Sequence, residues 1–478
     1  MFGRKRKEEN AENVTEENKT DKNTAKETEA CEHKSGFVLG VRGIYALPDS
    51  DDLMVIGKAE GTVKQGDAVF LSNLGEDDGY LFVSTVLGIE KAAREKVTEA
   101  CDCQVALRVE RASRYPVKPG TVVFSKDRTT KEVHPAYIAA LGDAYVAGKN
   151  LELTEKELDR LSITDCAELW GLFVWYHTKV MQNESEEAVR ENKRKIGILA
   201  KAMSTKILAA ETIYCIYSKA TGEPYLFSKI IYRKDGSNLC MCTPPMIRIL
   251  TKAYRDRMAD KFPEDKFEIR EIQNGTGRDG IRKFLGDCFY LNGACGLLAI
   301  GEQAAIAADM FVEKPDFSNV PEIRRPIMNP NLERWILLIG QLGQPETEDQ
   351  KTIYRVYYRL LAQEMVKARL LVPTKVTGEI PEPDAEGKVV LKKGVTFSFP
   401  TVNGKNGRPA VRMYTDWKRL RNAMGDEWQG NIQTIEGMIG KFDCIINLSE
   451  NIKTGCYVGE EMYRQMKALA ESGNEQPE

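Results

Sequence analysis

The sequence predicts a multidomain fold in which an antiparallel β-barrel is followed by two mixed α/β domains. Its 478 residues exceed the roughly 100 to 200 of a single domain and predict two to four domains. Short apolar runs separated by Gly, Asp and Pro between residues 37 and 128 are typical of a small barrel. The remainder contains one pattern of helices and strands twice, which predicts a tandem repeat.

Composition restricts the class of protein. Charged residues make up 29% of the chain, and 71 acidic against 68 basic side chains give a formal net charge of -3. These values exclude a largely disordered chain, a collagen-like fibre and a multi-span membrane protein. Eleven cysteines, an odd number, with no apolar secretory segment near residue 1, predict free thiols in a reducing cytosol. We therefore expect a cytoplasmic protein with no membrane partner.

Residues 1–35 and 471–478 are predicted to be disordered tails. The first tail contains eight Lys or Arg and nine Asp or Glu, and Val14 is its only large apolar residue after Phe2. Such a segment cannot bury enough surface to offset its chain entropy. It also contains Asn18-Lys19-Thr20-Asp21, the pattern that reads guanine in GTPases, but the chain has no phosphate-binding loop. We therefore expect no GTP binding.

Residues 36–128 are expected to form the barrel, with strands at 37–41, 53–57, 67–72, 80–89, 103–110 and 121–125. The clearest alternation places Cys101 and Cys103 on one face with Val105, Leu107 and Val109. We interpret the two cysteines as buried structural residues, because the whole chain has only three histidines to complete a metal site.

The barrel region resembles the second domain of elongation factor Tu and related translation factors. The resemblance lies in residues 57–69 (GKAEGTVKQGDAV), Val86 to Glu90, Ala100 to Val109 and Lys118 to Val122. It implies a six-stranded β-barrel that, in the family, packs against a GTPase domain and helps to grip RNA or the ribosome. Here the GTPase domain is missing, and Asp49-Ser50-Asp51-Asp52 replaces the usual G-R-G-T. The resemblance is therefore carried over to the fold and not to GTP.

After a helical connector at 129–161, domains are predicted at 162–320 and 328–470. Each begins with an apolar helix, and Trp170 and Trp335 lie at equivalent positions in the two helices. Acidic residues at 183–187 and 345–349 then favour the start of a long amphipathic helix in each copy. We pair residues 239–243 with 411–415, and residues 287–292 with 443–448, as matching strands.

The second copy resembles the SseB (enhanced serine sensitivity) family, and the first is a more divergent copy. The resemblance lies in Ala368 to Pro373, Met413 to Trp417 and a strand ending at Asn447, and it covers residues 331–465. It implies a cytosolic bacterial protein with a mixed α/β fold and no defined reaction.

The candidate binding residues are Thr415, Asp416, Trp417 and Asn447, which carry this family resemblance. The alternative role for Thr415 and Asp416 is helix capping, because threonine can cap a first turn and a carboxylate is stabilised at the positive end of a helix. Trp417 would instead contribute to a partly exposed aromatic surface.

Cys240 and Cys242 are the candidate reactive thiols. They lack histidine partners and the Cys-x-x-Cys spacing, so a structural role is the alternative. Residues 275–280 match G-x-G-x-x-G, but we interpret this lone motif as a surface turn. We expect no cofactor, no metal site and no catalytic set.

These observations predict a non-catalytic binding or adaptor protein of SseB-like type whose partner is another protein. The alternatives are a ribosome- or RNA-associated factor that acts through the barrel, and a thiol-dependent enzyme that uses the first α/β copy.

Overall fold

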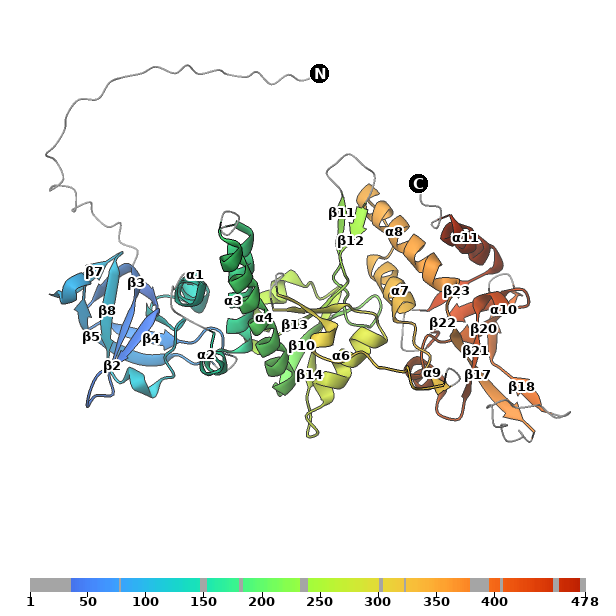
Figure 1. Ribbon diagram of the computed structural model, residues 1–478, viewed down its shortest axis with the longest axis horizontal. Coiled ribbons are helices and arrows are strands. Elements are labelled where there is room, and N and C mark those ends of the chain that lie inside the picture. Colours follow the sequence, from blue (N-terminus) through green and yellow to red (C-terminus); the bar gives the residue numbers. More distant parts are fainter. Residues whose placement is uncertain are drawn as a thin grey trace, which may run out of the picture.

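A computed structural model describes residues 36–76, 79–146, 153–179, 184–232, 240–300, 304–321, 324–378, 395–404, 407–449 and 455–472. A β-barrel lies at one end, and two α/β units follow it in a row (Figure 1). The predicted disordered tail at 1–35 lies outside the described residues, as does 473–478, whereas Glu471 is the last residue of a helix.

The N-terminal part is an antiparallel six-stranded barrel. Neighbouring strands pair in the cyclic order β1-β9-β4-β5-β8-β3, and β3 pairs again with β1 to close the barrel. The strands are β1 Phe37–Gly40, β3 Leu53–Lys64, β4 Ala68–Ser72, β5 Phe82–Glu90, β8 Gln104–Val109 and β9 Val122–Ser125. All six were predicted from the sequence. Three short strands lie off this path: β2 Gly43–Ala46, β6 Lys96–Val97 and β7 Glu99–Cys101.

The prediction that Cys101 points into the barrel core is wrong. Val105, Leu107 and Val109 are buried as expected, but before them Ala100 is buried and Cys101 is only half-buried. Asp102 adopts a left-handed conformation with φ 46° and separates β7 from β8. The extra residue at this break changes the face to which the preceding side chains point.

Two helices, α1 Thr130–Leu141 and α2 Glu155–Arg160, connect the barrel to the α/β units. Thr129 and Glu132 form a reciprocal capping box at the start of α1. The helix approaches β1 closely, because a Cβ atom at Gly40 would lie 2.4 Å from the carbonyl oxygen of Ala136. Glycine at this position allows the helix and the barrel to pack in direct contact.

The two α/β units share one topology. The first contains α3 Ile163–Lys179, α4 Glu186–Ala209, β10 Thr212–Ser218, β13 Ile247–Leu250, α5 Lys252–Met258, β14 Phe267–Gln273, α6 Gly280–Tyr290, β15 Gly296–Ala299 and β16 Ala305–Ala307. The second contains α7 Pro330–Leu342, α8 Glu348–Met365, β17 Leu370–Thr377, β20 Pro409–Met413, α9 Trp417–Met424, β21 Gln429–Gln433, α10 Ile435–Ile439, β22 Asp443–Ile446, β23 Cys456–Val458 and α11 Glu460–Glu471.

The two α/β units have similar strand orders. The first sheet has the order β14-β10-β13-β15-β16, in which β13 and β15 are parallel. The second has β21-β17 and β20-β22-β23, joined by a bridge between Leu371 and Tyr414, with β20 and β22 parallel. Each unit adds strands between its first two sheet strands: β11 Ile230–Tyr232 with β12 Cys240–Cys242 in the first, and β18 Thr396–Ser398 with β19 Thr401–Asn403 in the second.

The register corrects two of the predicted correspondences. The backbone N–H groups of Ile300 and Asn447 donate to the carbonyl oxygens of Ile249 and Met413, so these pairs are equivalent. The counterpart of residues 411–415 is therefore 247–251 and not 239–243, of which Cys240–Cys242 form strand β12 of the added ribbon. Residues 287–290 are also not a strand, because they belong to helix α6.

A continuous apolar core extends from the connector through both α/β units. It includes Tyr137 of α1, Phe173 of α3, Leu285 of α6 and Leu337 of α7. The two units therefore pack as one body. Within the described ranges, no helix is both long and apolar enough to cross a membrane.

Candidate functional site

Three of the four candidate binding residues meet in one buried cluster. Thr415 follows β20, and Asn447 follows β22, so the parallel pairing of these strands places both residues at the same sheet edge. The backbone N–H of Thr415 donates to Asn447 Oδ1 at 3.0 Å. Asp416 is the N-cap of α9, because its Oδ1 accepts from the backbone N–H of Arg419 at 2.9 Å. The residue that caps this helix is thus Asp416 and not Thr415.

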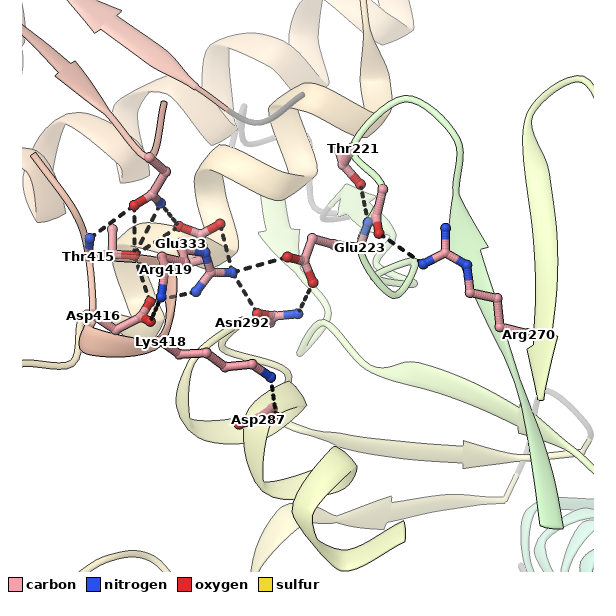
Figure 2. Close-up of polar contacts among 12 residues, drawn as sticks. Thr221, Glu223, Arg270, Asp287, Asn292, Glu333, Thr415, Asp416, Lys418 and Arg419 are labelled. Atoms are coloured by element: carbon pink, nitrogen blue, oxygen red, sulfur yellow. Dashed lines mark hydrogen bonds and ion pairs between the residues drawn. The ribbon is translucent and has the colours of Figure 1, made fainter. Parts of the chain in front are cut away.

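Arg419 lies at the centre of the cluster (Figure 2). Its guanidinium lies 2.6 Å from Asp416 Oδ2 and 3.1 Å from Glu333 Oε1, and it donates to Asn292 Oδ1 at 2.7 Å. Arg419 is 5% exposed and Glu333 is 0% exposed. A buried guanidinium needs this many partners, since the desolvation of an unpaired charge is costly.

Glu333 is the second residue of the cluster that sequence analysis missed. It comes from α7, and its Oε2 accepts from Asn447 Nδ2 at 2.7 Å. Burial raises the pKa of the Glu333 carboxyl to about 7, although Arg419 acts against this shift, and Asp416 and Glu223 add to it. The cluster therefore contains a carboxyl group that titrates near neutral pH.

The cluster joins the two α/β units. Asn292 and Glu223 come from the first unit, where Asn292 Nδ2 donates to Glu223 Oε2 at 2.9 Å. Lys418 of α9 pairs with Asp287 of α6 at 2.5 Å (Figure 2). Arg419, Glu333, Asp416 and Asn292 are buried and bind one another, so they hold the units together, and the partly exposed pair of Lys418 and Asp287 adds a contact nearer the surface. We refer to these contacts as the inter-unit junction.

Trp417 lies apart from the junction. Its half-buried ring packs with Leu371, Tyr414 and Leu420 in a small apolar cluster. This cluster is separate from the apolar core that the two units share. A Cβ atom at Gly430 would lie 2.7 Å from the Trp417 ring, so glycine is required at that position of β21 for this packing. The position is typical of a packing residue.

The candidate thiols lie in the β11–β12 ribbon. Cys240 pairs in register with Tyr232, and Cys242 with Ile230. Cys242 Sγ lies 2.9 Å from Ser228 Oγ, and the half-buried Cys242 packs against the core that the two units share. In the same unit, burial raises the pKa of the Cys215 and Cys288 thiols, which opposes formation of a thiolate. No cluster of three or more His, Cys, Asp or Glu suited to a metal ion occurs among the residues described.

A second buried ion pair joins the barrel to the first α/β unit. Lys118 Nζ lies 2.6 Å from Asp165 Oδ2, and it also pairs with Glu76. Tyr137 of α1 donates to Asp165 Oδ1 at 2.7 Å. Lys118 and Asp165 are both buried. The sequence contains no sign of this pair, because the contact joins positions that are far apart in the chain.

The architecture defines a class of chain in which a closed antiparallel barrel precedes a tandem pair of α/β units. No family model matches the sequence, and no curated protein matches it. Solved structures of translation factors are similar over a small part of the chain. The apo form of translation elongation factor SelB from Methanococcus maripaludis is 20% identical, with a TM-score of 0.18, over 20% of this chain and 20% of that chain. Sup35 complexed with GMPPNP is 23% identical, with a TM-score of 0.17, over 20% of this chain and 21% of that chain. The chain thus spans about a fifth of the length of these proteins.

Proposed function

We propose that this protein is a non-catalytic binding or adaptor protein that recognises another protein. One observation carries the proposal: Thr415, Asp416 and Asn447, the polar residues that looked most like a site, are buried in the inter-unit junction. Their hydrogen-bonding groups are used within the molecule, as expected for an architectural role.

We further propose that the α/β units are SseB-like. The residues on which the resemblance depends lie at the ends of strands and at a helix cap in the second unit: Met413 ends β20, Asp416 caps α9, and Asn447 follows β22. The same strand order in the first unit supports its interpretation as a divergent copy.

The outer surface of the barrel supports a protein partner. Leu81 is 44% exposed and Val83 is 56% exposed, and Leu87 projects from the same side of β5. Apolar side chains exposed on one face of a strand can take part in a protein-binding surface. We refer to these three residues as the β5 surface.

Affinity purification from the native host tests the proposal with the full chain as bait. We expect one protein to be enriched in stoichiometric amount by the native chain and lost when Val83→Lys introduces a charge into the β5 surface. Met462→Lys, a matched change at an exposed residue of α11, should leave the enrichment intact. Enrichment of no protein above background would refute the adaptor function, and equal enrichment by both variants would refute the β5 surface.

Ribosome or RNA association through the barrel is the first alternative. Acidic residues at one end of the barrel act against it, because Asp52 pairs with Arg108 at 2.7 Å and Asp51 pairs with Arg114 at 2.8 Å. Arginines paired in this way are less available to phosphates. Salt-sensitive co-sedimentation of the native chain with ribosomes would favour this alternative over a protein partner.

A thiol-dependent enzyme is the second alternative. Rapid alkylation of Cys240 or Cys242 at neutral pH would support it, because the reactive species is the thiolate. We expect slow alkylation at both positions, as for ordinary structural thiols.

A further inference from the structure

Strand β14 is an edge of the first sheet. It stands at one end of the strand order β14-β10-β13-β15-β16, and within the described ranges β10 is the only strand that pairs with it. The pairing runs through all seven residues of β14 without a bulge, and the strand contains no proline. Natural proteins usually interrupt or cover a regular edge of this kind, because its free backbone groups can pair with another chain.

The backbone of β14 presents alternate residues to the open side. At one end of the ladder, the N–H of Lys219 donates to the carbonyl oxygen of Lys266 at 2.9 Å, and at the other end the N–H of Asn274 donates to that of Glu211 at 2.8 Å. Residues that bond to the neighbouring strand alternate in an antiparallel ladder, so the even-numbered residues of β14 face β10. The odd-numbered residues therefore direct their N–H and C=O groups away from it.

Ile269 and Glu271 have free backbone groups on this open side. Among the residues that the structure describes, neither forms a hydrogen bond there, whereas the N–H of Phe267 already donates to the Pro263 oxygen at 2.9 Å. The half-buried side chain of Ile269 packs against the apolar cluster that includes Phe262. A strand laid along β14 would thus meet two N–H donors, those of Ile269 and Glu271, beside an existing apolar surface.

The charges on β14 select one register for pairing with a second copy. A two-fold axis that joins two sheets edge to edge keeps their faces aligned, so directly opposed residues are both odd-numbered or both even-numbered. An axis at Glu268, Arg270 or Glu271 would oppose two like charges, which destabilises a strand pair. An axis at Ile269 opposes the two isoleucines and places each Glu268 across from Arg270 of the other copy. An axis near either end would pair only part of the strand.

Arg270 keeps the partners within its own chain in this arrangement. Its guanidinium lies 2.8 Å from Glu268 Oε2, and its guanidinium carbon lies 4.1 Å from the centre of the Tyr217 ring. The pairing needs no new bond from this side chain, because the contact depends on backbone hydrogen bonds and on the two isoleucines. The charges serve only to exclude the registers in which like charges meet.

We propose that this protein forms a symmetric dimer in which β14 pairs antiparallel with β14 of a second copy, centred on Ile269. Two backbone hydrogen bonds join the Ile269 residues, and two more run from the N–H of each Glu271 to the Phe267 carbonyl oxygen of the other copy. The first sheet then continues from one copy into the other. The contact uses neither the β5 surface nor the inter-unit junction, so the dimer would carry two β5 surfaces and bind a partner bivalently.

Sedimentation velocity of the full chain tests the proposal. Because an edge pair is a small interface, we expect a reversible dimer with a dissociation constant of about 10 to 100 µM. Ile269→Pro removes a donor that faces away from β10, a position at which an edge strand tolerates proline, and should weaken the dimer about tenfold or more. Glu471→Lys, a charge reversal on the exposed face of α11, should leave the dimer unchanged.

Two charge reversals test the register independently of folding. Glu268→Lys opposes two pairs of cations and Arg270→Glu two pairs of anions, so each variant alone should dimerise about tenfold or more less tightly than the native chain. An equimolar mixture restores opposite charges at both positions and should recover the dimer. Both variants have lost the ion pair within their own chain, so a change in stability cannot produce this recovery.

Three results would each overturn the proposal. The first is a native chain that remains monomeric at about 200 µM, well above the expected dissociation constant. The second is a dimer that Ile269→Pro leaves unchanged, since the copies would then meet through another surface. The third is a mixture of Glu268→Lys and Arg270→Glu that dimerises no better than either variant alone.

Discussion

The raised pKa of Glu333 predicts a specific pH dependence of stability. Its carboxyl is buried and faces Arg419, Asp416, Glu223, Thr415 and Asn447, and its pKa changes from an ordinary value of 4.5 to about 7 in the folded protein. Between these two pH values, the folded state binds more protons than the unfolded state. The free energy of unfolding therefore falls as pH rises through this window, and Glu333 accounts for about 3 kcal/mol of that fall.

Glu333→Gln isolates this contribution. Glutamine keeps the shape of the side chain and an oxygen that can accept from Asn447 Nδ2, but it cannot ionise. We expect the stability of the variant, relative to the native protein, to increase by about 3 kcal/mol between pH 4 and pH 8. All other titrating groups are common to the two proteins and cancel in this difference.

Urea unfolding followed by tryptophan fluorescence measures the effect. All five tryptophans lie in the α/β units, so the signal reports on the body that contains the inter-unit junction. Glu471→Gln, a change at an exposed residue of α11, serves as the control and should follow the native curve at every pH. If the Glu333→Gln curve also runs parallel to the native curve, the assignment of a near-neutral carboxyl to this cluster is wrong.

Three further changes test the packing between units by the same unfolding measurement. Arg419→Met should cost about 3 to 5 kcal/mol, because it leaves buried carboxylates without their cation, and a cost below about 1 kcal/mol would contradict the role of the junction. Lys118→Met should cost a similar amount, because it leaves the Asp165 carboxylate without its cation. Adding Asp165→Asn to this variant should restore part of the lost stability. If the stability losses of the two single variants simply add in the double variant, the two residues do not interact. Gly293→Ala should cost about 2 to 4 kcal/mol, because φ is +74° and the new Cβ would lie 2.0 Å from the Pro330 oxygen. Gly275→Ala is the control: its φ is +70° but the space around it is open, so it should cost only about 1 kcal/mol.

Local patterns were sufficient to predict the barrel strands and the helices that open each α/β unit. The barrel strands are bounded by turn residues, and their alternation is visible within a few positions. Likewise, Trp170 and Trp335 mark equivalent helices because no insertion separates them from the start of each unit.

Errors arose where an insertion or one backbone residue changed the register. The β11–β12 ribbon displaced the predicted match for residues 411–415 by eight positions, so Cys240 and Cys242 were compared with the wrong strand. Residues 287–290 were assigned to a strand because their apolar run is short, but Leu285 and Cys288 share one face of helix α6. The left-handed residue Asp102 similarly reversed the expected burial of Cys101.

The polar junction could be predicted only in part. Thr415, Asp416 and Asn447 were identified from a family resemblance, but nothing near Arg419 or Glu333 in the sequence indicates that they meet. Their partnership depends on the fold bringing the first turns of helices α7 and α9 together beside Asn292 of the first unit. A charged residue within an amphipathic helix usually faces solvent, so local pattern alone predicts the wrong environment for Arg419.

The buried ion pairs have a practical consequence for dissecting the chain. A fragment without the barrel would retain Asp165 but lose Lys118, and a fragment that begins at α7 would retain Arg419 but lose Asn292 and Glu223. Each truncation would thus expose a new surface that carries a charged group without its partner, which favours misfolding or nonspecific association. Fragments made by cutting between the units are therefore poor substitutes for the native chain, and point substitutions in the full-length protein are the appropriate tools for assigning function to each part.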